Sequence, residues 1–335
     1  MRVWVKRGVV GLLTGCILLA SWVGWWAWRE LPLRAPTVEL AIEPGTPVRQ
    51  IAEQVQAAGV QVSPSLLYWM FRLSGQARQI RAGNYEITTG VSAWQLLQKL
   101  ARGEESLQAV TLIEGWTWRQ WRAALDKADH LRHDTRDLSD ADLARRLGLT
   151  LETLEGHFYP DTYTYGKGSS DLKVLERAQR AMDRQLDQWW KQRASDLSIS
   201  QREEARILAS LIEKESGRAS DRAMISSVFH NRLRLGMPLQ TDPTVIYGMG
   251  TTFDGNLRRR DLRTDHAWNT YTRHGLPPTP IAMPGKGALM AAVQPARSQA
   301  LYFVARGDGS SEFSDNLEQH NRAVDRYQRV KRQAQ

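Results

Sequence analysis

Glu215 is the side chain whose place in the sequence best suits acid–base chemistry. The pattern of residues 201–216 predicts a helix that ends before Gly217. Its apolar stripe consists of Ile207, Leu208, Leu211 and Ile212. At 100° per residue, Glu215 lies about 20° from Leu208 around the helix and should point with the buried face. Glu213 lies about 140° from Leu208 and should face solvent.

Two effects are expected to raise the pKa of Glu215. Partial burial disfavours a charged carboxylate, and so does the negative end of the helix dipole at the last turn. A carboxylic acid that stays protonated near neutral pH is what a general acid for glycosidic cleavage requires. The alternative is a structural ion pair with Arg218 or Arg222, and the sequence leaves both interpretations open.

Two polar, proline-rich loops follow the predicted helices, at residues 236–248 and 268–285. The candidate substrate-binding residues on them are Gln240, Thr241, Asp242, Asn269 and Tyr271. Their hydroxyl, amide and carboxylate groups can hydrogen-bond to sugar hydroxyls and N-acetyl groups. Asp242 could instead cap the helix that follows it. It is also the candidate for the second carboxylate of an ordinary glycosidase, which lies about 5–9.5 Å from the acid.

Several other chemistries have no motif in this sequence. The chain contains no His-Glu-x-x-His and no Gly-x-Ser-x-Gly, and Gly285-Lys286-Gly287 lacks the upstream glycine of a phosphate loop. Cys16 is the only cysteine, which excludes a disulfide framework or a cysteine–zinc site in the rest of the chain. We therefore expect neither a metal nor a cofactor.

The first 30 residues predict a membrane anchor. Gly8 to Trp28 is an uncharged run of 21 residues, and three basic residues precede it. The positive-inside bias then keeps the N-terminus in the cytoplasm and places the body of the protein on the outer side. A cleaved signal peptide, or a lipoprotein cleavage box ending at Cys16, are the alternatives. Both also place the body outside the cytoplasm.

Composition is that of an ordinary globular protein with room for two domains. The chain has 335 residues, of which 42% are hydrophobic and 24% charged, and its net charge is +9. That charge suits an acidic polymer or an anionic membrane surface. A solvated basic surface without a specific partner remains open. Nucleic acid is not an expected partner of a translocated protein.

A strand, a glycine turn and an amphipathic helix recur three times, starting from Ile42, Ile87 and Leu112. The offsets of 45 and 25 residues are unequal, so the copies do not form a solenoid. Helices are also predicted over 139–147 and 171–195, with two more between 200 and 235. The fold class expected from these patterns is α+β.

Several motifs in a fixed order resemble the endolytic murein transglycosylase (YceG-like) family. They are Leu208-Ala-Ser-Leu-Ile-Glu-Lys-Glu-Ser-Gly217, Leu239-Gln-Thr-Asp-Pro-Thr-Val-Ile-Tyr-Gly248, Asn269-Thr-Tyr271 and Ile281-Ala-Met-Pro-Gly285. The resemblance covers about residues 37–328 and implies that Glu215, the second glutamate of Glu-Lys-Glu-Ser, is catalytic. Residues 44–52 resemble a LysM glycan-binding repeat.

The domains implied are an anchor at 1–30, a linker at 31–36, a LysM-like module at 37–105 and a mainly helical, lysozyme-like YceG catalytic domain at 106–335. The activity implied is lytic cleavage of the β-1,4 bond between N-acetylmuramic acid and N-acetylglucosamine, leaving 1,6-anhydro ends. The implied setting is the inner membrane, with the catalytic domain in the periplasm beside peptidoglycan synthases and nascent strands. Two alternatives remain open: a non-catalytic peptidoglycan-binding scaffold, and a two-carboxylate muramidase that uses Asp242.

Overall fold

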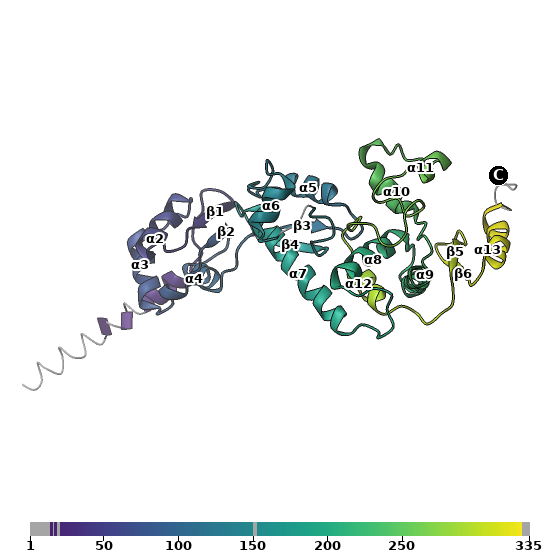
Figure 1. Ribbon diagram of the computed structural model, residues 1–335. Coiled ribbons are helices and arrows are strands. Elements are labelled where there is room, and N and C mark those ends of the chain that lie inside the picture. The colour runs from purple at the N-terminus through teal and green to yellow at the C-terminus, as the bar shows by residue number, and fades with distance from the viewer. Residues whose placement is uncertain (1–13, 16, 19–20, 150–152, 330–335) are drawn as a thin grey trace, which may run out of the picture. The chain divides into compact units, whose positions relative to one another are not determined.

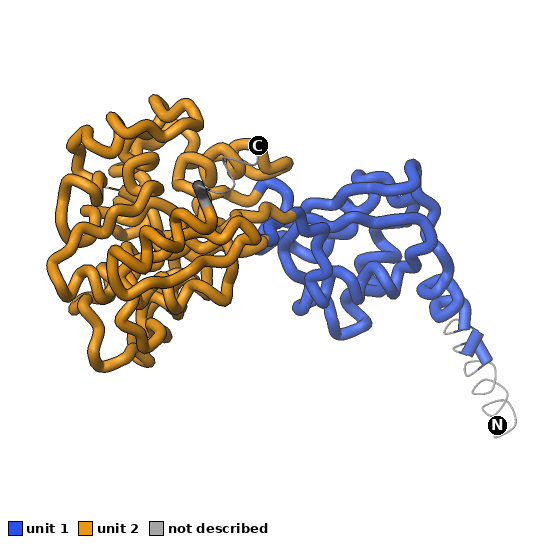
Figure 2. Tube along the Cα trace, turned by 90° about the vertical axis from the view of Figure 1, so that its right-hand side faces the viewer, with its two compact units in different colours: residues 1–108, 164–168 blue, residues 109–163, 169–335 orange. Residues whose placement is uncertain are grey.

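The computed structural model describes residues 14–15, 17–18, 21–149 and 153–329. Within the chain, two compact units can be distinguished (Figure 2). Unit 1 comprises residues 1–108 and 164–168, and unit 2 comprises residues 109–163 and 169–335.

Unit 1 is a small α+β unit built on one two-stranded sheet (Figure 1). Strands β1 (Thr37–Ile42) and β2 (Gly83–Thr88) pair antiparallel, with Leu40 opposite Tyr85. Alternate residues of β1 are buried, as the period of a strand requires. Its helices are α2 (Val48–Ala57), α3 (Pro64–Leu73) and α4 (Ala93–Arg102), with a short 3-10 turn, η1 (Ala77–Gln79). Their apolar faces share one core with the sheet.

The three predicted strand–turn–helix copies are confirmed. They are β1 with α2, β2 with α4, and β3 (Leu107–Leu112) with α5 (Trp118–Asp126). The turn glycines Gly45, Gly90 and Gly115 have φ angles of 84°, 92° and 75°, which favour glycine. The second and third helices begin with capping boxes, whereas α2 begins after Pro47 without a side-chain cap. The hydroxyl of Thr46 donates to the carbonyl of Glu43 at 2.8 Å, within the turn before α2.

Unit 2 is mainly helical. Its further elements are α6 (Asp140–Arg146), β4 (Asp161–Gly166), α7 (Asp171–Lys191), α8 (Arg202–Glu215), η2 (Ala219–Asp221), α9 (Arg222–Arg234), α10 (Asp242–Met249), η3 (Gly250–Thr252), α11 (Arg259–Arg263), α12 (Lys286–Val293), β5 (Tyr302–Ala305), β6 (Ser311–Ser314), α13 (Leu317–Val324) and the π-helical turn η4 (Asp325–Arg329). β3 pairs with β4, and β5 pairs antiparallel with β6. The division between the units falls within β3 and β4.

Helix α8 lies at the centre of unit 2, where it packs against α7, α9, α10 and α12. The mixed α+β class is thereby confirmed, and so are the helices expected at 139–147, 171–195 and 200–235, although α7 ends at Lys191. Ends that differ by a few residues are usual, because terminal turns depend on local capping.

The predicted anchor lies partly outside the described residues, which omit 8–13, 16 and 19–20 and therefore Cys16. Residues 21–28 are helical. Among the described residues, no helix combines the length and the apolar character that crossing a membrane requires.

Candidate active site

Helix α8 begins one residue later than its sequence suggests. Gln201 is the N-cap and Glu204 completes the capping box. The Glu204 carboxylate accepts hydrogen bonds from the backbone N–H groups of Ser200 at 2.6 Å and Gln201 at 3.0 Å. These bonds satisfy N–H groups that the helix leaves without internal partners, so the start of α8 is well fixed.

Glu215 is the last residue of α8, on the face that the apolar stripe predicts. Leu208 and Leu211 are fully buried, and Glu215 is partly exposed beyond them. Its Oε1 accepts a hydrogen bond from the hydroxyl of Thr241. Burial raises the pKa of Glu215 to about 7; the Thr241 bond and Arg232 oppose this, and the charge of Asp242 adds to it. The predicted direction of the pKa shift is confirmed, with burial as its main cause.

Glu213 does not face solvent, and that prediction was wrong. Its side chain is only 5% exposed and forms an ion pair with Arg222 at 2.9 Å. Its other oxygen accepts from the backbone N–H of Gly285 at 2.8 Å. The apolar stripe is not the only buried face of α8, because Arg222 of α9 and Gly285 at the start of α12 cover Glu213 on another side.

The two arginines that were candidate ion-pair partners of Glu215, Arg218 and Arg222, have other partners in the structure. Arg222 is engaged by Glu213, and Arg218 lies 3.7 Å from a carboxylate oxygen of Asp308. Within the described part of the chain, no arginine forms an ion pair with Glu215. The alternative of a structural ion pair with Arg218 or Arg222 is therefore not what the structure shows.

A chain of threonines holds the loop that faces Glu215. Thr241 is the N-cap residue of α10 and is 1% exposed. Its N–H donates to the hydroxyl of Thr270 at 3.1 Å, and the N–H of Gln240 donates to the Thr270 carbonyl at 3.1 Å. Thr244 donates to the carbonyl of Thr241 at 2.7 Å. Gln240 has a left-handed φ of 52°, and the residue after it, Thr241, meets the Glu215 carboxyl.

Arg232, which the sequence analysis did not single out, supports the same loop from α9. It is buried, and its guanidinium donates to the carbonyl of Leu239 at 2.8 Å and to that of Leu301 at 2.7 Å. Its guanidinium carbon lies 5.1 Å from the ring centre of Tyr302. The local sequence does not indicate that this arginine is buried, because partners such as Leu301 and Tyr302 lie about 70 residues further along the chain.

Asp242 and Tyr271 meet beside Glu215. The Tyr271 hydroxyl donates to Oδ1 of Asp242 at 2.5 Å. The pKa of Tyr271 is raised by burial first, and then by Asp242 and by the charge of Glu215. Asp242 is the first residue of α10, and Thr241 takes the cap position that was one interpretation of Asp242.

Asn269 lies at this site, where its side chain bonds to the backbone around Tyr271. It is fully buried, and its amide donates to the carbonyls of Thr264 at 2.7 Å and Leu262 at 3.2 Å. Its oxygen accepts from the N–H of Tyr271 at 2.8 Å. Both the donors and the acceptor of its amide are thus engaged by backbone groups. Asn269 fixes the loop that presents Tyr271.

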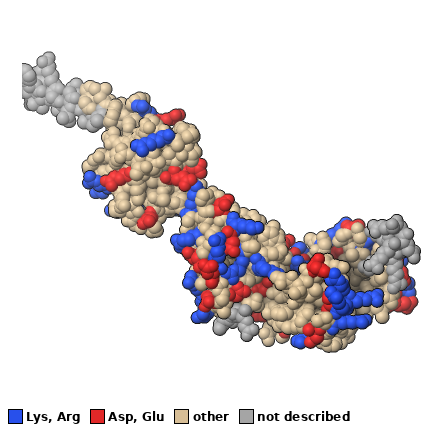
Figure 3. Space-filling model, turned by 90° about the horizontal axis from the view of Figure 1, so that it is seen from above, with Lys and Arg blue, Asp and Glu red and all other residues tan. Residues whose placement is uncertain are grey.

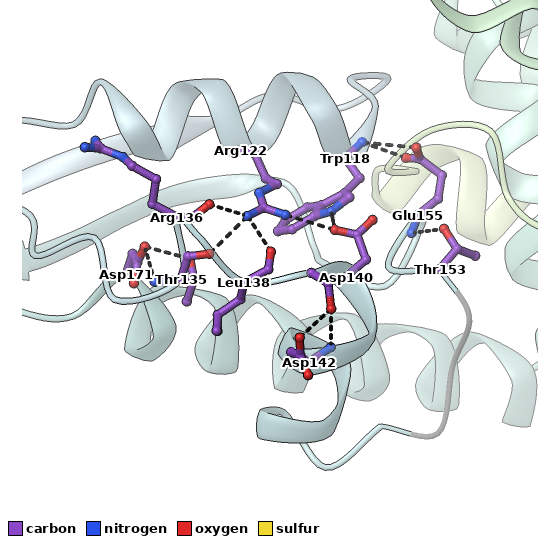
Figure 4. Close-up of polar contacts among 11 residues, drawn as sticks. Trp118, Arg122, Thr135, Arg136, Leu138, Asp140, Asp142, Thr153, Glu155 and Asp171 are labelled. Carbon is purple, nitrogen blue, oxygen red and sulfur yellow. Dashed lines mark hydrogen bonds and ion pairs between the residues drawn. The ribbon is translucent and has the colours of Figure 1, made fainter.

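Glu155 is a second buried carboxylate that the sequence analysis did not select. Burial raises its pKa to about 7, although it accepts bonds from the N–H of Trp118 at 2.9 and 3.1 Å (Figure 4) and from Tyr247. It is 3% exposed and holds the first turn of α5. Glu215 differs because it is more exposed and has a single hydrogen-bond partner, Thr241, among the described residues. Accessibility, rather than the pKa alone, separates the candidate acid from a structural carboxylate.

The residues described by the structure contain no group of three or more His, Cys, Asp or Glu side chains that could hold a metal ion.

Thr241→Val tests the hydrogen bond to the acid. Because that bond lowers the pKa of Glu215, its loss should move the alkaline limit of activity to higher pH. We also expect kcat to fall about tenfold, since the carboxyl loses the bond that orients it. Thr241→Ser keeps a hydroxyl and should retain both the pH limit and most of kcat. An unchanged pH profile in Thr241→Val would contradict this role.

The fold and the site define an α+β protein in which a partly exposed carboxylic acid is the last residue of a central helix. The model of the YceG-like family matches residues 40–326, and the chain belongs to this family.

Relatives and a solved structure agree with that membership. The chain is 31% identical over 312 residues to the endolytic murein transglycosylase of Bacillus subtilis (strain 168), covering 87% of this chain and 85% of that protein. It is 26% identical to the endolytic murein transglycosylase of Streptococcus pneumoniae serotype 2, covering 96% of this chain and 65% of that longer protein. A crystal structure of a YceG-like protein from Listeria monocytogenes matches with a TM-score of 0.52 and 28% identity, covering 86% of this chain and 98% of that one.

Proposed function

We propose that this chain is an endolytic lytic transglycosylase that cuts the glycan strands of peptidoglycan, with Glu215 as its acid. Membership of the YceG-like family and the relatives named endolytic murein transglycosylase support an enzyme acting on peptidoglycan. The observation that best supports this role for Glu215 is its raised pKa at the partly exposed end of a helix. The hydroxyl of Thr241 donates a hydrogen bond to the same carboxyl group.

The bond cut is the β-1,4 bond between N-acetylmuramic acid and N-acetylglucosamine. The protonated Glu215 donates its proton to the glycosidic oxygen, and the bond to the anomeric carbon breaks. The 6-hydroxyl of the same muramic acid then bonds to that carbon and gives its proton to Glu215, which restores the acid. One carboxylic acid is enough because the nucleophile belongs to the substrate, whereas ordinary hydrolases need two carboxylates.

The residues around the acid have separate tasks in this proposal. Thr241 orients the carboxyl, and Tyr271 and Asp242 form a polar wall beside it. Gln240 lies on the left-handed turn before Thr241 and is exposed, so its amide can bind substrate. Asn269 holds the loop of Tyr271 in place.

The organisation proposed for the chain follows from its sequence. Residues 8–28 anchor it in the inner membrane, residues 37–105 form a LysM-like glycan-binding module, and residues 106–335 form the catalytic domain in the periplasm. A single anchor would keep the enzyme near nascent strands and near the synthases that make them.

Mass spectrometry of the glycan ends released from purified peptidoglycan tests the reaction. The full-length protein should release 1,6-anhydro ends. Reducing ends would instead show a hydrolase and direct attention to Asp242 as a second carboxylate. Binding without cleavage by the full-length protein on nascent glycan would show a scaffold.

The pH dependence of kcat/KM is a further test. The acid must be protonated, and the pKa of Glu215 is about 7 in a setting that includes Asp242 and Arg232. We therefore expect kcat/KM to fall above about pH 7 and to approach a tenfold loss per pH unit. A rate that stays constant to pH 9 would contradict the assignment. Circular dichroism across the same range controls for unfolding, because Glu155 has a similar pKa.

A further inference from the structure

A cavity in unit 2 lies next to the candidate active site, and the mechanism above does not use it. Its volume is about 430 Å³, within the range of small-ligand sites. It is lined by Arg259, Leu262, Arg263, Tyr271 and Thr272. Figure 3 shows Lys and Arg side chains gathered on the face of unit 2 seen from the side of α10 and α11.

The two arginines of this cavity have no acidic partner within the described residues, whereas their neighbours do. Arg258 pairs with Asp254 at 2.6 Å and Arg260 with Asp261 at 3.5 Å. Arg259 and Arg263 are exposed and stand four residues apart on α11, which places them on one side of the helix. Two adjacent guanidinium groups suit a carboxylate, which each can bind through paired N–H donors.

The cavity is joined to the acid by a short series of contacts. Tyr271 forms one wall, and its hydroxyl donates to Asp242 at 2.5 Å. Asp242 follows Thr241, whose hydroxyl donates to Glu215. A ligand group in the cavity would therefore lie close to the sugar that reacts at Glu215.

We propose that this cavity binds a carboxylate of the peptide stem on a muramic acid residue near the cleaved bond. The proposal rests on the proposed function, because it takes peptidoglycan as the substrate. Where a stem is attached, the lactyl carboxyl of the muramic acid is taken up in an amide bond. The free carboxylates of the stem are then the anionic groups that unpaired arginines would attract. The enzyme would thus prefer stems whose carboxylates are free over stems in which they are carboxamides.

Binding to a matched pair of ligands tests the proposal. The full-length Glu215→Gln protein, which should not cut, is titrated with two stem-bearing tetrasaccharides by calorimetry. One has free stem carboxylates, and in the other they are carboxamides of nearly the same shape. We expect the free acid to bind at least tenfold more tightly, as expected for charge-assisted hydrogen bonds. Adding Arg259→Gln and Arg263→Gln should remove that preference and leave binding of the carboxamide unchanged.

Arg180→Gln with Arg322→Gln is the matched control, because it removes the same charge from exposed arginines that do not line the cavity. This control should keep the tenfold preference. Equal binding of the two ligands by the Glu215→Gln protein would overturn the proposal, as would an equal loss for both ligands in the Arg259/Arg263 variant. Because binding is measured without cleavage, a wild-type protein that binds but cuts nothing would refute the proposed function alone.

Discussion

Glu215→Gln is expected to reduce the rate of strand cleavage by about 10³-fold, within the usual range for loss of a general acid. The amide has nearly the shape of the acid and can still accept the hydrogen bond from Thr241. It cannot donate a proton to the glycosidic oxygen or take one from the 6-hydroxyl. The measurement is the rate at which new glycan ends appear from purified peptidoglycan, with circular dichroism to establish that the variant folds.

Glu155→Gln is the matched control for this loss. Glu155 is also buried in unit 2, and burial also raises its pKa to about 7. Because its oxygens hold the start of α5 and Tyr247, its replacement should lower stability but leave the folded enzyme within tenfold of the wild-type rate. If Glu155→Gln lost as much activity as Glu215→Gln at equal folding, the assignment of the acid would be wrong.

Gly156→Ala is expected to lower the free energy of unfolding by about 3 kcal/mol, from a left-handed backbone and an overpacked contact together. Gly156 has a φ of 78°, which disfavours a side chain. An added Cβ would also lie 2.5 Å from Cβ and 2.6 Å from Cγ of Pro280, whose ring cannot rotate away. Urea denaturation, followed by tryptophan fluorescence, measures the loss.

Gly148→Ala separates the two causes. Gly148 has a similar φ of 71°, but an added Cβ would meet nothing within 4 Å. It should therefore lose only the backbone part, about 1 kcal/mol. If both variants lost the same free energy of unfolding, the close approach of Gly156 to Pro280 would contribute nothing to the loss.

The sequence determined the features that depend on neighbours along the chain. The three strand–turn–helix copies follow from alternation, a glycine with positive φ and helical periodicity, all within about 15 residues. The face of α8 that Glu215 shares follows from the same periodicity, since the angle between Leu208 and Glu215 is fixed by helix geometry. The raised pKa of Glu215 could be expected for the same reason, because a carboxyl on a buried face is partly removed from water.

The tertiary structure alone decided which side chains meet. Glu213 is buried because Arg222 and Gly285 close over a second face of α8, and no periodicity within α8 contains that information. Asn269 is engaged by the backbone carbonyls of Leu262 and Thr264, at and after the end of α11, and Asp242 meets Tyr271 from a segment 29 residues away. Local patterns set which residues are helical and apolar, but hydrogen bonds between distant segments exist only after the helices have packed. The position of Glu215 on the buried side of α8, near the end of the helix, was therefore readable from the sequence, whereas its surroundings were not.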